Sequence, residues 1–355
     1  MIAREHQMYS PPSAPHAGLW LPPGGDGGRA TPLLDRALWT LVAFIVVSGS
    51  FAVLRSDVRF AGAPKWFWME KLTWGADADV VIAGDSRVYR GVDPSVFEEQ
   101  LGIARNFGFS SAKFTTEFLA GAEAVLDPKG HRVLILGLSA FSLNDGSSPR
   151  DGFTEAQRDL ARLRLPIAVA RALEQWELAA GPIALDAGGM AGEGEASGLA
   201  RATTDEYAQV FHGNGWVESD RYVADPIANG LAVVRKDYAG ETLVDAGDAG
   251  RSPANSPGPL AKGLVKRAHE LVDRGVTVVA FRVPVPPEVA AEEDRLSGIN
   301  FGRLHQELEA AGALWVDVPY DGLRSYDGSH LDGESATALS QALIRGTPGR
   351  NVVPD

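Results

Sequence analysis

The sequence contains no cysteine among its 355 residues. Disulfide bonds, thiolate metal sites and cysteine nucleophiles are therefore excluded, and this feature does not indicate the redox compartment. Positive charge is also scarce, because 33 Lys and Arg stand against 46 Asp and Glu, a formal net charge of −13. A phosphate backbone is bound by clustered cations, so we expect no nucleic-acid partner.

Motifs for nucleotides and metals are missing as well. No GxxxxGK(S/T) or GxGxxG pattern lies at the end of a predicted strand, so no nucleotide-binding loop is indicated. Asp327, His330 and Asp332 are close in sequence, but neither an HExxH motif nor a second histidine cluster accompanies them. We therefore expect no metal and no cofactor.

The first part of the chain contains a Pro/Gly-rich stretch and then an apolar run. Residues 1–32 show no apolar period, which predicts a disordered tail. Residues 37–54 carry no charge. As a helix they would span about 27 Å, close to the roughly 30 Å hydrocarbon core of a bilayer, so we expect one transmembrane helix that anchors the protein.

Two alternatives to a permanent anchor stay open. A core helix would show a wider polar stripe than Thr40, Ser48 and Ser50 provide. A cleaved signal peptide is favoured by the small residues 48–50 but opposed by the long segment before the apolar run. The flanking cations do not fix the orientation, because they are more numerous after the run than before it.

Residues 55–77 form a juxtamembrane segment that contains three tryptophans within KWFWMEKLTW, residues 65–74. Tryptophan and lysine together are typical of a bilayer interface. Packing of the same side chains beneath the following domain explains the composition equally well.

Residues 78–346 alternate between apolar strands and helical patterns. Strands are predicted at 78–86, 103–110, 132–139, 276–284 and 314–319, with helices at 94–101, 112–126, 301–312 and 332–346. This alternation predicts an α/β fold in which helices cover both faces of a parallel sheet. Residues 141–258 interrupt it with helical pieces, a Gly/Ala-rich stretch and a loop-like segment at 212–226, and we interpret them as an insertion, a lid or specificity region. A short tail, 347–355, follows.

The first strand ends at Gly84, Asp85 and Ser86, and Arg87 follows. In parallel α/β sheets ligands bind beyond the carboxyl ends of the strands. A glycine permits a tight turn into a helix, whose first residue, a serine, would present its hydroxyl to a cleft. The same serine also makes an ordinary helix cap.

Two further motifs end other segments of the sheet. NFGFSSA, residues 106–112, follows the second strand, and its glycine and asparagine suit an oxyanion hole as well as a plain turn. SYDGSHLDGESA, residues 325–336, places Asp327 three positions before His330, close enough for the carboxylate to orient the imidazole. Of the seven histidines, His330 is the one that we single out as a candidate base, because it lies in this motif with Asp327.

In this order the motifs GDS, NxGxS and DxxH resemble those of the SGNH (GDSL-like) hydrolase superfamily, apart from the insertion. The resemblance implies a three-layer, flavodoxin-like α/β fold and a serine hydrolase site. Ser86 would be the nucleophile, His330 the base and Asp327 the acid that orients the base.

The resemblance also implies an oxyanion hole formed by the backbone N–H groups of Ser86 and Gly108, with Asn106 supporting the loop. The superfamily usually has GxND after the third strand, and its asparagine completes the hole. Here residues 137–140 read GLSA, so Ser139 is the remaining side-chain donor. Loss of one oxyanion donor typically costs about 3 kcal/mol, which predicts inefficient hydrolysis.

The apolar run, the GDSR form with Arg87, the absent asparagine and the insertion resemble an anchored subgroup of that superfamily. Its members accompany membrane-bound O-acyltransferases in polysaccharide acetylation and D-alanyl transfer. The resemblance implies a single-pass inner-membrane protein with its catalytic domain outside the cytoplasm. The implied partners are an acylated polysaccharide or acyl donor and a membrane-bound O-acyltransferase.

Two functions are therefore predicted. The first is a membrane-anchored serine esterase or O-acyltransferase that acts on acyl esters, chiefly acetyl esters, of a cell-surface polysaccharide. The second is a weakly active or inactive module that binds a polysaccharide or an acyltransferase partner. Phosphoryl chemistry at the same loops remains a third alternative.

Overall fold

In the computed structural model the chain divides into two units, Met1–Leu54 and Arg55–Asp355. The structure describes residues 64–144, 151–167, 169–170, 209–219, 221–238 and 258–347, together with Arg36, residues 38–44 and Val47. The predicted tail at 1–32, the three central stretches 145–150, 171–208 and 239–257 of the insertion, and residues 348–355 lie outside the described residues.

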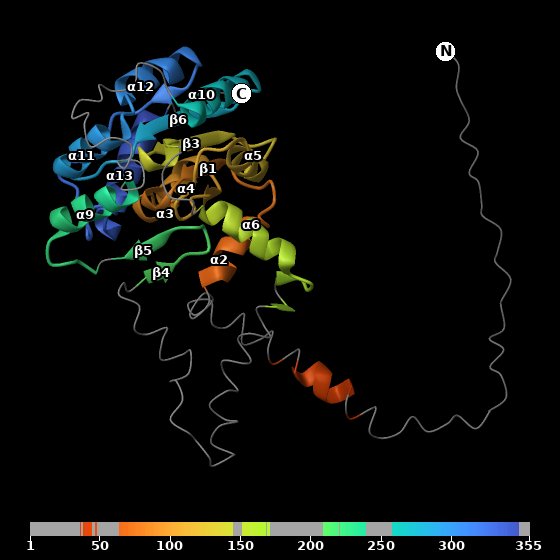
Figure 1. Ribbon diagram of the computed structural model, residues 1–355. Helices are drawn as coiled ribbons and strands as arrows, with labels where there is room; N and C mark the ends of the chain where they lie inside the picture. The colour runs from red at the N-terminus through yellow and green to blue at the C-terminus, as the bar shows by residue number, and fades with distance from the viewer. Residues whose placement is uncertain are drawn as a thin grey trace, which may run out of the picture. The chain divides into compact units, whose positions relative to one another are not determined.

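The second unit contains a five-stranded parallel sheet in the order β2-β1-β3-β6-β7 (Figure 1). The strands are β1 (Val80–Gly84), β2 (Ala104–Asn106), β3 (Val133–Leu138), β6 (Thr277–Arg282) and β7 (Leu314–Trp315). All residues of β1 and β3 are buried, because both faces of the sheet are covered. The predicted α/β class with a parallel sheet and flanking helices is confirmed.

Helices cover both faces of the sheet (Figure 1). One face packs against α5 (Thr116–Val125), α10 (Pro259–Asp273) and α12 (Phe301–Ala310). The other face packs against α3 (Ser86–Gly91), α4 (Ser95–Leu101) and α13 (Gly333–Gly346). Successive residues of a strand point to opposite faces, so Val81 joins the first core and Ile82 the second.

The remaining elements come from the beginning of the second unit, from the insertion and, for α11, from the segment after β6. They are α2 (Pro64–Lys71), the 3₁₀ turn η2 (Phe141–Leu143), α6 (Gly152–Arg162), β4 (Gln209–Phe211), β5 (Val217–Ser219), α9 (Pro226–Tyr238) and α11 (Pro287–Ser297). The segment predicted to be loop-like, 212–226, contains β5 and the turn of the antiparallel β4–β5 hairpin, so that prediction is wrong at 217–219, and β4 directly precedes the segment. The two strands were not predicted because each has only three residues and they flank the turn sequence HGNG.

Helix α2 carries most of the aromatic segment at 65–74. Trp66, Phe67 and Met69 are buried, and Trp66 and Met69 pack against residues of and after α6. These side chains pack in the domain, as the second interpretation of this segment expects.

Of the predicted membrane anchor at 37–54, the structure describes residues 38–44 and 47, which are helical. Within the described residues, no helix has the length and apolar character needed to cross a membrane. The rest of the predicted span lies outside the described residues.

Candidate active site

The three predicted motifs meet at the carboxyl end of the sheet. Ser86 begins α3 directly after β1, while Asp327 and His330 lie in the loop before α13. His330 Nε2 is 2.9 Å from Ser86 Oγ, and His330 Nδ1 is 2.7 Å from Asp327 Oδ2. These contacts align a hydroxyl, an imidazole and a carboxylate in the order that nucleophilic catalysis uses.

The carboxylate of Asp327 fixes the protonation of the imidazole. Its Oδ1 accepts the backbone N–H groups of Ser329 and His330 at 2.9 and 2.8 Å. Burial alone would raise the pKa of Asp327, but the charge and hydrogen bonds of His330, with those two amides, lower it to about 2. An ionised Asp327 accepts the proton on His330 Nδ1, so Nε2 keeps the lone pair that accepts the Ser86 hydroxyl.

Burial lowers the pKa of His330 from its usual value, and the charge of Asp327 opposes this only in part. The nearby cations Arg90 and Arg87 lower the pKa further. The imidazole is therefore neutral at neutral pH, which is the state required of a general base.

Asp85 shapes the turn that presents Ser86. Its carboxylate caps α3 by accepting the N–H of Arg87 at 3.0 Å, and it also accepts the hydroxyl of Ser139. Ser139 is 2% exposed and its N–H contacts Ser142 Oγ at 3.2 Å. The single hydroxyl proton of Ser139 is thus directed to Asp85, so Ser139 supports Asp85 and is not a free oxyanion donor.

Asn106 organises the loop after β2. Its side-chain amide donates to the carbonyls of Val88 and Val92 at 3.0 and 2.9 Å, which ties the loop to α3. Its Oδ1 accepts the N–H of Gly108 at 3.0 Å. The expected oxyanion donor of Gly108 is therefore already bonded within its own loop, whereas the N–H of Ser86 has no partner among the described residues.

Arg87 connects α3 with two other parts of the site. Its guanidinium forms a two-pronged ion pair with Glu293 of α11, at 3.0 Å and 2.5 Å, and donates to Ser329 Oγ at 3.1 Å. Burial alone would lower the pKa of Arg87, but Glu293 and, more weakly, Asp85 raise it, so the charge is fixed. Because the backbone N–H of Ser329 donates a hydrogen bond to Asp327, Arg87 positions the loop that contains Asp327 and His330.

Tyr326 packs against the imidazole of His330, and Arg90 holds Tyr326 in place. The ring of Tyr326 stacks on His330 with centroids 5.9 Å apart and an interplanar angle of 19°. Arg90 donates to the Tyr326 hydroxyl, and Arg90 lies one helical turn after Ser86. The guanidinium therefore fixes Tyr326 and also discourages protonation of His330.

The insertion braces the triad loop. Asn229 of α9 donates to the carbonyl of Asp327 at 2.7 Å, and Gly230 packs against Gly328. Gly328 has φ +82°, and a Cβ atom there would lie 1.8 Å from the carbonyl oxygen of Pro226. Only glycine fits between Asp327 and Ser329 under these two constraints.

The sequence predicted Ser86, Asp327 and His330, which the structure brings together, and some of the residues that support them, but Arg90, Tyr326 and Glu293 were missed. Arg90 follows Ser86 by four positions on a predicted helix, and Tyr326 lies inside the quoted SYDGSH motif, so both had a local signal. No local sequence signal indicated Glu293, because 206 positions separate it from its partner Arg87.

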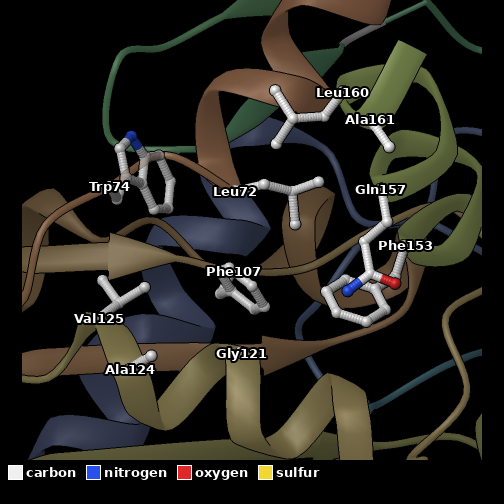
Figure 2. A pocket seen from close by; sticks show the side chains of 10 residues that line it. All are labelled: Leu72, Trp74, Phe107, Gly121, Ala124, Val125, Phe153, Gln157, Leu160 and Ala161. Atoms are coloured by element: carbon white, nitrogen blue, oxygen red, sulfur yellow. The ribbon is translucent and has the colours of Figure 1, made fainter.

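An apolar cavity of about 360 Å³ lies elsewhere, between α5 and α6 (Figure 2). Phe107, Phe153 and Leu160 line it, Gln157 supplies an amide, and no triad residue contributes. Among the described residues no group of three or more His, Asp or Glu is arranged to hold a metal ion.

Comparison with known proteins gives no assignment: no family model, curated protein or solved structure matches the chain. The function therefore has to be argued from the site itself.

Proposed function

We propose that the protein is a membrane-anchored serine esterase or O-acyltransferase that acts on acyl esters, chiefly acetyl esters, of a cell-surface polysaccharide. The observation that carries this proposal is the continuous hydrogen-bonded series from Asp327 through His330 to Ser86. Ser86 is half-buried and is therefore not sealed from a ligand.

The reaction follows from the protonation states. Ser86 Oγ bonds to the acyl carbon as its proton passes to His330 Nε2, and Asp327 stabilises the imidazolium that forms. The tetrahedral intermediate then breaks its bond to the leaving alcohol, which takes the proton from Nε2. Water or a sugar hydroxyl next gives its proton to Nε2 as its oxygen bonds to the acyl carbon. This second tetrahedral intermediate breaks its bond to Ser86 Oγ, which takes the proton back from Nε2.

Stabilisation of the oxyanion is the weak part of this site. The N–H of Ser86 is available, but the N–H of Gly108 and the hydroxyl of Ser139 have partners already. Each missing donor costs about 3 kcal/mol in the barrier, so turnover by water is expected to be slow. The same oxyanion forms when a sugar hydroxyl attacks, so the missing donors slow hydrolysis and transfer alike, and the choice between them depends on how the site excludes water and positions the sugar.

The location and the partner of the protein are inferred from the family resemblance. GDS at 84–86, NxGxS at 106–110 and DxxH at 327–330 resemble the SGNH superfamily, and the chain as a whole resembles its anchored subgroup. We infer a single transmembrane helix at 37–54, a catalytic domain outside the cytoplasm and a membrane-bound O-acyltransferase as partner. The exposed side chains of Leu38, Trp39 and Leu41 support an apolar environment for this segment.

The engaged oxyanion donors favour a second candidate, a weakly active or inactive module that binds a polysaccharide or an acyltransferase. In that case the triad geometry would persist without turnover. The two candidates differ in whether Ser86 becomes acylated.

Ester turnover tests the proposal. We expect the full chain in detergent to release nitrophenol from p-nitrophenyl acetate, and a sugar acceptor to raise the rate if transfer dominates. Ser86→Ala should abolish the reaction, and Asp327→Asn should slow it on the order of 10⁴-fold by reversing the imidazole tautomer. Ser95→Ala is the matched control, because Ser95 is an exposed serine at the start of α4 and belongs to none of the three motifs. Equal rates for Ser86→Ala and Ser95→Ala would reject the nucleophile.

A further inference from the structure

Lys71, the last residue of α2, is buried in the domain with 1% of its surface exposed. Within the described residues no carboxylate forms an ion pair with its ammonium group. Burial lowers the pKa of Lys71 well below its usual value. An unpaired buried cation is costly, so the position of Lys71 calls for a specific partner.

Aromatic rings surround the ammonium group. Its nitrogen lies 4.7 Å from the ring centroid of Phe67, 5.0 Å from Trp68, 5.5 Å from Phe109 and 5.6 Å from Tyr89. Ring faces attract cations, which favours the charged form of the lysine without a carboxylate.

The polar contact of Lys71 is the loop that contains Gly108. Lys71 Nζ donates to the carbonyl of Gly108 at 2.7 Å, while Asn106 holds the N–H of the same residue. Gly108 is pressed against α3, since a Cβ atom there would lie 2.9 Å from both the backbone N and the Cβ of Tyr89. Both peptide groups of Gly108 are therefore fixed relative to the helix that begins with Ser86.

We propose that Lys71 is a positioning residue of the acyl-transfer site, whose ammonium group fixes the Gly108 peptide against α3. Helix α2, which precedes the catalytic domain in sequence, thereby sets the geometry of the loop beside the nucleophile. This inference rests on the proposed serine chemistry.

Substitution to methionine separates positioning from packing. In the full chain we expect Lys71→Met to lower kcat for an aryl acetate about 10- to 100-fold with little change in KM, because a small displacement near reacting groups has this effect. Its unfolding midpoint should change little, because removal of a desolvated ammonium offsets loss of the hydrogen bond to Gly108. Lys65→Met is the control, an exposed lysine of the same helix, and should leave both quantities unchanged. Unchanged kcat in Lys71→Met would overturn the proposal.

A chemical rescue decides the case in which Lys71→Met does not fold. The chain has no cysteine, so Lys71→Cys introduces a single thiol. Alkylation of the unfolded full chain with 2-bromoethylamine, followed by refolding, restores an ammonium group, whereas 1-bromopropane gives a neutral side chain of similar shape. Recovery of kcat with the first reagent alone supports the proposal. Equal activity of the two products, or failure of both to fold, would overturn it.

Amide hydrogen exchange distinguishes failure of this inference from failure of the proposed chemistry. If the wild-type chain forms no acyl-Ser86, the serine chemistry fails, and Lys71 is judged by exchange alone. Faster exchange at Gly108 and Phe109 in Lys71→Met, but not in Lys65→Met, would support positioning. Unchanged exchange would reject it.

Discussion

Arg87 joins α3, α11 and the triad loop through one buried guanidinium group. Arg87→Met leaves Glu293 charged and buried without a partner, so we expect a loss of about 3–5 kcal/mol in the free energy of unfolding. Arg282→Met is the control, because Arg282 forms a similar two-pronged pair with Asp294, a more exposed residue of the same helix. Such exposed pairs are worth about 0–1 kcal/mol. Urea unfolding that gave equal losses for both variants would contradict this role of Arg87.

The pH profile of the reaction follows from the charges around His330. Its lowered pKa keeps the ring neutral in mild acid, so the acid limb of kcat/KM is expected below the usual histidine pKa. Arg90→Gln removes a positive charge that disfavours the protonated ring. The pKa of His330 then rises and the limb moves to higher pH. Arg324→Gln, an exposed cation of the same loop region that is not among the charges acting on His330, should leave the limb in place; an equal shift in both variants would contradict the assignment.

At the scale of elements, the junction between α9 and the triad loop depends on a glycine. Gly328→Ala must accommodate both φ +82° and the overlap of its Cβ with the Pro226 carbonyl. Gly322 has φ +79° with nothing within 4 Å, so Gly322→Ala meets the backbone strain alone, about 1–2 kcal/mol. We expect Gly328→Ala to cost about 1–3 kcal/mol more and to lower esterase activity. Equal unfolding midpoints for the two variants would show that α9 does not brace the loop.

The elements differ in how far the sequence predicts them. Strands β1, β3 and β6 are continuous apolar runs because both sheet faces are covered, and such runs are readable without the structure. Edge strands β2 and β7 are shorter than predicted, at three and two residues, because each pairs with only one neighbour. Helix α9 and the β4–β5 hairpin depend on contacts with distant loops, so no local pattern predicts them.

The candidate site divides in the same way. Ser86, Asp327 and His330 lie in short motifs at strand and loop ends, so their meeting follows from the parallel sheet. Their electrostatic surroundings do not, since Glu293 and Lys71 reach the site from elements far away in sequence. The hydrogen bond from the Ser139 hydroxyl to Asp85 could likewise not be predicted from the sequence motifs, because it depends on how the ends of β1 and β3 lie side by side.

At the scale of the whole molecule, the chain divides into the unit Arg55–Asp355 and the unit Met1–Leu54, which contains the apolar run. If residues 37–54 anchor the protein, the full chain should sediment with membranes, and a fragment from Arg55 onward should remain in the supernatant. Circular dichroism of the fragment would show that it is folded. A folded fragment that still sediments with membranes would place membrane contact in the aromatic segment at 65–74 or in the insertion instead.

The central claim is that Ser86 forms an acyl-enzyme with His330 as its base. Intact mass of the full chain after exposure to an activated acetyl ester tests it most directly, with Ser86→Ala and His330→Ala alongside. We expect one added acetyl group, located on Ser86 by peptide mapping, absent in Ser86→Ala and slower to form in His330→Ala. If the folded wild-type chain gains no acetyl group, or if Ser86→Ala gains it equally, Ser86 is not the nucleophile and the binding-module function is favoured.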